Sequence, residues 1–390
     1  MTLSTRITTL LGDGSDGWDV FNKARGMIAD GVAVTELTIG EHDIRTHPDI
    51  LAAMNASAVG GHTGYAAIPG TPGLASAVAD RIARQSGVPT RPGNILITAG
   101  GQAGLFAAHM GVTDPGDKAL FIDPYYATYP GTIRSVGAVP HPIVTQARHA
   151  FLPQRDALEE AAKSAKSLLI NSPNNPTGVI YPRETLEMIA DICIRHDLWL
   201  ISDEVYDSQV WDGAHLSPRA LPGMAERTLV IGSMSKSFAM TGARVGWVCG
   251  PETAISHLTD LSTNTNYGVA GFVQDAAEYA LRRGNGLEQE VAAPFRRRRA
   301  ITLDALRGQT AVTAIPPQGA MYTMLDIRAT GLTGEAFAYG LLEAEHIAVM
   351  PGESFGQSAA GHIRVAMTVD DDTYRDALSR LIQFAQVRAA

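Results

Sequence analysis

The chain has 390 residues, and its 31 basic and 40 acidic side chains give a formal net charge of −9. Hydrophobic residues make up 45% of the chain and charged residues 18%, so a buried core is expected and a disordered chain is excluded. A sequence pI near 5.6 argues against a nucleic-acid-binding protein, which normally carries a basic surface. The two cysteines are too few for a disulfide framework and fit the cytoplasm, where we expect this protein.

The N-terminal residues, MTLSTRITTLLGDGSDGW, lack an apolar segment followed by a small-residue cleavage site, so no secretion signal is expected. No window approaches 18 consecutive apolar residues, and we therefore predict neither a transmembrane helix nor a membrane partner. The absence of an internal repeat excludes a solenoid fold.

The middle of the chain alternates short apolar runs with longer helical patterns. Helices are predicted at 102–112 and at 182–196, where Leu186, Ile189 and Cys193 share one face with Ala190. Apolar runs without alternation are typical of strands that are covered on both faces. We predict an α/β fold with a mostly parallel central sheet flanked by helices over residues 46–285, with strands at 94–99, 119–123, 167–171, 199–203 and 228–232.

The C-terminal part of the chain has a different pattern. A long charged helix is predicted at 288–306, and its four consecutive arginines, Arg296–Arg299, could suggest an anion site. The acidic composition of the chain instead favours a solvated helix face. With strands at 321–327 and 362–367 and a final helix from Asp372, residues 1–45 and 286–390 are predicted to form a smaller α+β domain.

Two polar stretches follow predicted strands in the first half of the sheet. Glycines in Thr98–Gly104 lie between a strand and a helix, where backbone N–H groups could bind a phosphate, although a tight turn explains them as well. The spacing matches neither a Rossmann nor a Walker motif. Asn171–Gly178 (NSPNNPTG) combines ordinary turn residues at unusual density directly after a strand.

Two further stretches contain ionisable side chains at strand ends. Asp203 closes a strongly apolar strand and needs a partner, but no His or Cys lies at ligand spacing, so no metal is predicted. Lys236 ends another apolar strand, where a lysine loses its charge readily and can form a Schiff base, unless it extends to solvent. Ser233-x-x-Lys236 also matches the serine motif of penicillin-binding enzymes, but the accompanying Ser-Asp-Asn and Lys-Thr-Gly tripeptides do not occur.

Taken together, the segments NNPTG, SDEVY and SMSKSFAMTGARVGW resemble the class I/II (fold-type-I) aminotransferases that use pyridoxal 5'-phosphate (PLP), in particular the aspartate/aromatic branch. The resemblance extends from Gly40 to Arg364. It implies a fold-type-I architecture, PLP as cofactor and a homodimer with shared active sites.

The resemblance also implies roles for individual residues. Lys236 would hold the cofactor through a Schiff base and act as general base, and Asp203 would pair with the pyridine nitrogen. Tyr206 and Asn175 would donate to the phenolate oxygen, and Tyr126 would stack on the ring unless it is a core tyrosine. The cofactor phosphate would be held by Gly101, Gln102, Ser233, Ser235 and Arg244, and by Tyr65 of the neighbouring subunit.

For the substrate, the resemblance implies that Arg364 binds the α-carboxylate, assisted by Asn175 and by the backbone of Gly40. Some aspartate-using relatives have a lysine directly after the double glycine. This chain has Gln102 there, which leaves the residue that contacts the substrate side chain open. The alternatives by proximity in sequence are His42, Arg45 and His109.

The expected activity is transfer of an amino group from an L-amino acid to a 2-oxo acid, expected to be 2-oxoglutarate, by a ping-pong mechanism. A PLP-dependent C–S β-lyase on the same fold is the alternative, although such lyases usually differ around the asparagine turn and the Asp-Glu segment. A regulator with an aminotransferase-like sensor domain would need an added basic DNA-binding module, for which the sequence before about residue 35 leaves no room.

Overall fold

The most apolar segments of the sequence form one seven-stranded sheet in the computed structural model, which describes residues 1–12 and 18–389. Only β8 runs antiparallel to its neighbours, so the sheet is mostly parallel, as predicted. The strands lie in the order β2 (Ile95–Thr98), β8 (Gly246–Cys249), β7 (Thr228–Ser233), β6 (Trp199–Asp203), β5 (Ala165–Asn171), β3 (Lys118–Asp123) and β4 (Val139–Val144).

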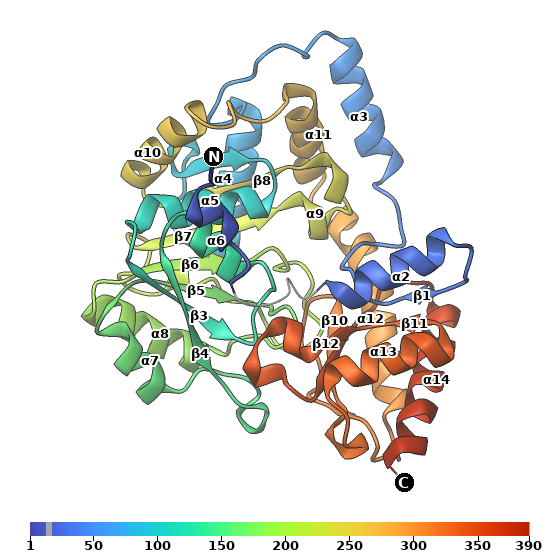
Figure 1. The fold of residues 1–390 in the computed structure, drawn as a ribbon. Helices are drawn as coiled ribbons and strands as arrows, with labels where there is room; N and C mark the ends of the chain where they lie inside the picture. Colours follow the sequence, from blue (N-terminus) through green and yellow to red (C-terminus); the bar gives the residue numbers. More distant parts are fainter. Residues whose placement is uncertain (13–17, 390) are drawn as a thin grey trace.

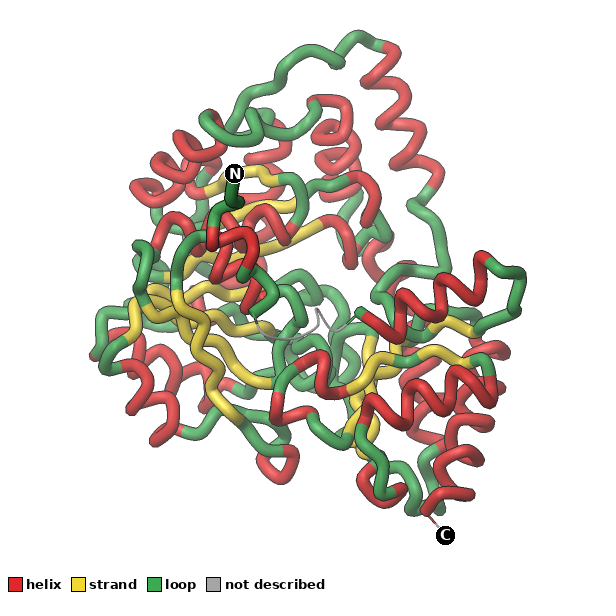
Figure 2. The backbone as a smooth tube through the Cα atoms, viewed as in Figure 1, coloured by secondary structure: helices red, strands yellow, loops and turns green. Residues whose placement is uncertain are grey.

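Helices cover both faces of this sheet (Figure 2). Successive residues of β3 pack in opposite directions: Phe121 joins a core with α5, α6 and α10, whereas Leu120 joins a core with α7 and α8. This arrangement explains why the strands are apolar without alternation. The helices are α3 (Pro48–Val59), α4 (Pro72–Ser86), α5 (Gly101–Val112), α6 (Tyr129–Ser135), α7 (Arg155–Ala162), α8 (Arg183–Arg195), α10 (Glu252–Thr263) and α11 (Gly271–Arg282).

A smaller α+β part holds the C-terminal segments (Figure 1). Its antiparallel sheet has the order β12 (Met350–Pro351), β13 (His362–Ala366), β10 (Tyr322–Asp326) and β9 (Thr313–Ala314), and β1 (Thr35–Glu36) pairs with β11 (Ile347–Ala348). Its helices are α2 (Asp19–Ala29), α12 (Gly286–Ala305), α13 (Gly334–Glu345) and α14 (Asp371–Ala389).

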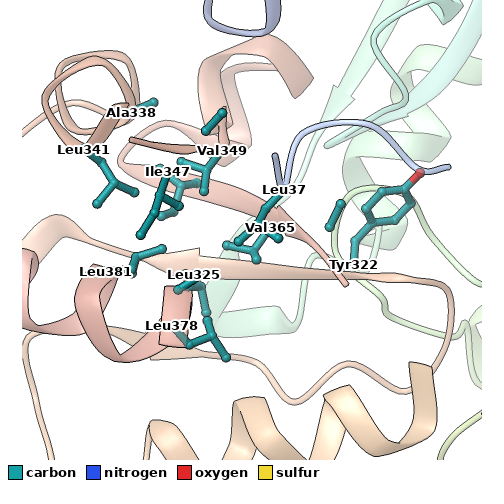
Figure 3. Close-up of a cluster of buried hydrophobic side chains, with 14 of the residues drawn as sticks. Leu37, Tyr322, Leu325, Ala338, Leu341, Ile347, Val349, Val365, Leu378 and Leu381 are labelled. Carbon is teal, nitrogen blue, oxygen red and sulfur yellow. The ribbon is translucent and has the colours of Figure 1, made fainter. Parts of the chain in front are cut away.

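The N-terminal segment contributes to the core of the smaller part. Leu37 packs there with Ile347, Val365 and Leu378 (Figure 3). However, the short helix α1 (Thr5–Thr8) contacts α6 of the larger part. The division into residues 46–285 and residues 1–45 with 286–390 therefore stays a prediction.

The predicted solvated face of the arginine-rich helix is wrong at Arg298. This side chain is only 2% exposed on α12, and it donates hydrogen bonds to Asp43 at 2.9 Å and to Asp371 at 3.0 Å. An α-helix completes one turn every 3.6 residues, so four consecutive arginines point in all directions around the helix. On a helix packed against the rest of the protein, one of them must therefore face inward. Two carboxylates compensate its charge there, while Arg296 and Arg297 are exposed as expected.

The two cysteines are buried thiols on α8 and β8, and burial raises the pKa of both Cys193 and Cys249 to about 12. Their low reactivity follows from this burial. In the part of the chain that the structure describes, no helix has the length and apolarity needed to cross a bilayer.

Candidate active site

A cavity of about 260 Å³ lies beyond the carboxyl ends of β5, β6 and β7, the edge at which open α/β sheets bind ligands. Pairing of Asn171 with Asp203 aligns the ends of β5 and β6 there. All of the predicted site residues except Tyr65 line this cavity: Gly40, Gly101, Gln102, Tyr126, Asn175, Asp203, Tyr206, Ser233, Ser235, Lys236, Arg244 and Arg364.

Lys236 lies in the single-turn helix α9 (Met234–Ser237) that directly follows β7. Its Nζ donates a hydrogen bond to the Gly40 carbonyl oxygen. Its own carbonyl oxygen is contacted by Gln209 Nε2 at 3.2 Å and by His42 Nε2 at 3.0 Å. Burial lowers the pKa of Lys236, which increases the fraction of neutral amine able to attack a carbonyl carbon.

Asp203 is a buried carboxylate at the end of β6. Tyr129 Oη donates to its Oδ2 at 2.7 Å, and the Val205 N–H donates to its Oδ1 at 3.3 Å. Burial nevertheless raises the pKa of Asp203 to about 6. A buried carboxylate with this pKa is poised to pair with a protonated ring nitrogen, because a cation beside it would stabilise the ionised form.

Arg364, on β13, is 1% exposed and is held between two aromatic rings, with its guanidinium carbon 4.3 Å from the centre of Tyr322 and 4.4 Å from that of Phe355. Its Nη1 donates to Asn175 Oδ1 at 2.9 Å, and its Nη2 donates to the Thr38 carbonyl oxygen. Nε has no hydrogen-bond partner among the described residues. A carboxylate ligand would satisfy this buried donor.

The N-terminus of α5 forms one wall of the cavity together with Arg244. Gly100 precedes the helix with φ of 84°, and a Cβ atom there would lie 2.3 Å from Arg244 Nη2. The first N–H groups of the helix, at Gly101 and Gln102, have no partner within the helix. Since a guanidinium and free N–H groups lie together, this wall fits a phosphate dianion.

Two serine hydroxyls lie on the same side of the cavity. Ser233 ends β7, and its Oγ accepts a hydrogen bond from the Ser235 N–H at 3.1 Å. The two hydroxyl oxygens are 2.9 Å apart. Because hydroxyl hydrogens rotate freely, both groups could donate to an anion bound beside Arg244.

The other predicted cofactor residues are tyrosines. Tyr206 Oη lies 3.1 Å from Tyr322 Oη, and burial raises the pKa of Tyr206 well above its ordinary value. Tyr126 lines the cavity, 5.8 Å from the Tyr129 ring, and burial raises its pKa to about 12. Tyr65 is 90% exposed, so its role toward a neighbouring subunit stays a prediction.

Among the candidates for contact with the substrate side chain, only Gln102 lines the cavity. Its Nε2 donates to Thr132 Oγ1 at 2.7 Å, and its Oε1 accepts from Thr128 Oγ1 at 3.0 Å. The three alternatives lie elsewhere. His42 contacts the Lys236 carbonyl oxygen, Arg45 is exposed on the surface, and His109 is buried in α5.

Sequence reasoning missed several residues of this site. Tyr129, the partner of Asp203, lies only three residues after Tyr126, so the tyrosine-rich segment DPYYATYP contained a signal for it. Tyr322 and Trp18 line the cavity from distant parts of the chain. No motif marks either of them, because tertiary packing alone brings them to the site.

The residues therefore fit PLP: a buried amine for its aldehyde, a buried carboxylate for its ring nitrogen and an anion site for its phosphate. Residues 32–381 match the family model described as aminotransferase class I and II. The chain is 37% identical over 373 residues to the arginine–pyruvate transaminase AruH of Pseudomonas aeruginosa, with 95% of both chains covered. It is 34% identical over 370 residues to an aspartate/prephenate aminotransferase of Thermus thermophilus, with 94% of both chains covered.

Solved structures of aminotransferases also resemble this chain. Aspartate aminotransferase of Thermus thermophilus with maleate superposes with a TM-score of 0.92 at 32% identity, covering 98% of this chain and all of that one. The fold is therefore the fold-type-I architecture that the sequence predicts. Family model, relatives and structures agree that the chain is an aminotransferase of class I and II.

Proposed function

We propose that this aminotransferase uses PLP to transfer the amino group of an L-amino acid to a 2-oxo acid by a ping-pong mechanism. The observation that carries the proposal is the joint placement of Lys236, Asp203 and Arg364 around one cavity that also contains an anion site. When bound, PLP would supply an electron sink for the negative charge that develops at the substrate Cα.

Each of these residues has a defined role in this proposal. The Lys236 amine would hold the cofactor at its aldehyde carbon and, as a free amine, would move the proton at Cα. The Asp203 carboxylate keeps the ring nitrogen protonated. Tyr206 and Asn175 donate to the cofactor's phenolate oxygen. Arg364 orients the α-carboxylate, so that the Cα–H bond faces Lys236.

The amino acceptor that the sequence predicts is 2-oxoglutarate. The names of the relatives include pyruvate for the Pseudomonas aeruginosa enzyme and prephenate for the Thermus thermophilus enzyme. We therefore propose to measure 2-oxoglutarate and pyruvate in parallel. The cytoplasm remains the expected compartment.

A homodimer with shared active sites is also part of the proposal, because Tyr65 is exposed and does not line the cavity of its own chain. Mixing Lys236→Ala and Tyr65→Ala chains tests it. A mixed dimer has one site with both residues intact, so activity above the sum of the two separate variants is expected. Activity equal to the sum of the two separate variants would contradict a shared site.

The direct test of the function is a half-reaction. The cofactor-loaded protein is mixed with amino acids and no acceptor, and its absorption spectrum and the 2-oxo acid released are followed. We expect a stoichiometric spectral change with one 2-oxo acid per site. Continuous release of pyruvate and ammonia from cystathionine without an acceptor would instead support the C–S β-lyase.

A further inference from the structure

The basic side chains that line the inner cavity are all engaged by the proposed function. Within the described residues they are Lys236, Arg244 and Arg364, which serve the cofactor aldehyde, the phosphate and the α-carboxylate. Gln102 adds a neutral amide whose two ends are held by threonine hydroxyls. Among the described residues, the lining of the inner cavity therefore offers no further cation for a carboxylate on the substrate side chain.

The inner cavity, which is also lined by the acidic residues Glu41 and Asp203, continues into a groove of about 1180 Å³. The two share Trp18, Gln102 and Arg244 as lining residues. The acidic residues of the groove are Asp19, Glu335 and Glu353.

The arginines of the groove are engaged with backbone oxygens. Arg134 Nη1 donates to the Leu10 carbonyl at 3.2 Å, and Arg244 Nη1 donates to that of Thr241 at 2.7 Å. Glu353 is also engaged, because it accepts the Gly334 N–H at 2.9 Å. All three acids are exposed, and among them Asp19 directly follows Trp18 in the sequence.

Trp18 connects the groove to the α-carboxylate site. Its ring lies 5.5 Å from Phe21 and packs against the apolar cluster that contains Phe355. Phe355 in turn packs against the Arg364 guanidinium. Asp19 follows Trp18 as the first residue of α2 and lines the groove, while Trp18 lines both the groove and the cavity that contains Arg364.

We infer that the amino donor is an L-amino acid with a long cationic side chain, such as arginine, lysine or ornithine, and that Asp19 determines this specificity. The α-carboxylate binds to Arg364, whose buried Nε has no partner among the described residues. The alkyl chain lies along Trp18, and the cationic end pairs with Asp19. This inference rests on the proposed function. Because the inner cavity offers no further cation for a second carboxylate, the inference also favours pyruvate over 2-oxoglutarate as acceptor.

The test compares kcat/KM of the cofactor-loaded enzyme for arginine, for citrulline as its neutral isostere and for aspartate, with pyruvate and 2-oxoglutarate as acceptors. Arginine is expected to exceed both other donors. Asp19→Asn is expected to lower kcat/KM for arginine by about tenfold, as for the loss of one charge pair, and to leave that for citrulline unchanged. Asp30→Asn, an exposed acid after the other end of α2, is the matched control and should change neither.

Two results would overturn the inference while leaving the transaminase intact. One is a preference for aspartate over arginine, as expected if the partner subunit supplies a cation. The other is an equal effect of Asp19→Asn on arginine and citrulline. Absence of a spectral change with every amino acid would instead refute the proposed function itself.

Discussion

The two ends of the active-site cavity are built differently. At the proposed cofactor end, Asp203 closes the buried strand β6 and Lys236 lies in the single-turn helix after the buried strand β7, and each makes hydrogen bonds to the surrounding chain. At the side-chain end, Trp18 and Asp19 come from the N-terminal segment and border a solvent-exposed groove. In the proposed function, the chemistry is therefore carried by residues at strand ends, whereas specificity depends on which segments pack across the opening.

The largest effect is expected at the cofactor end. Lys236→Ala removes both the amine that binds the cofactor and the base, so kcat should fall by at least about 10³-fold and the absorption of lysine-bound cofactor should disappear. Steady-state kinetics and an absorption spectrum measure this. The exposed Lys163→Ala variant is the control and should behave as the parent protein does. Retained activity in Lys236→Ala would refute the assignment.

Asp203→Asn should lower kcat by about 10²- to 10³-fold, because a neutral amide does not hold the ring nitrogen protonated. Steady-state kinetics of the cofactor-loaded variant measure this effect. A near-normal rate would show that the cofactor end does not depend on this carboxylate.

The same variant should have the opposite effect on the stability of the cofactor-free chain. Burial raises the pKa of Asp203 from 3.8 to about 6 in the folded chain. Because the folded state then binds more protons than the unfolded state, stability falls as the pH rises from about 4 to above 6. Asp203→Asn should therefore raise the free energy of unfolding by up to about 3 kcal/mol at pH 8, where the buried carboxylate is ionised, and change it little at pH 4. Thermal unfolding at both pH values checks the sign.

Gly40→Ala tests the close approach of the Gly40 backbone to Tyr322 in the cavity wall. A Cβ atom at Gly40 would lie 1.8 Å from Tyr322 Oη, so either the Tyr322 side chain or the segment that contacts Lys236 must move. A shift of this size should lower kcat/KM by about 10²-fold. Gly26→Ala is the matched control, because a Cβ there meets no atom within 4 Å. Equal activity of both variants would contradict the geometry.

Arg364→Lys should have a smaller effect on kcat/KM. It distinguishes binding of the α-carboxylate from binding of the substrate side chain. Lysine keeps the charge but loses the bidentate geometry, so kcat/KM should fall by about 10- to 100-fold for all α-amino acids alike. Alanine and arginine as donors provide the comparison. An effect confined to one class of side chain would mean that Arg364 contacts the side chain and not the α-carboxylate.

Much of the larger part could be predicted because its strands are apolar on both faces. The helix predicted at 182–196 is Arg183–Arg195, and all four residues expected on its apolar face are buried. The smaller part was harder to predict. Its β1 and β11 are two residues each and lie about 300 positions apart, so no local pattern marks their pairing.

That most of the proposed cofactor residues line one cavity could be predicted, because short motifs place them at strand ends, where topology brings them together. The burial of Arg298 was missed because a run of four arginines gives no sign of which one faces Asp43 and Asp371. The proposed side-chain end could not be predicted either. No local sequence pattern marks Trp18, which reaches the cavity through tertiary packing against the cluster that contains Phe355.

The role of Lys236 is measured most directly by borohydride reduction of the PLP-loaded protein, followed by peptide mass spectrometry. Reduction fixes a Schiff base as a stable amine, so we expect one cofactor per chain on the peptide that contains Lys236. Unmodified Lys236, or cofactor fixed to another lysine, would contradict the assignment on which the mechanism is built.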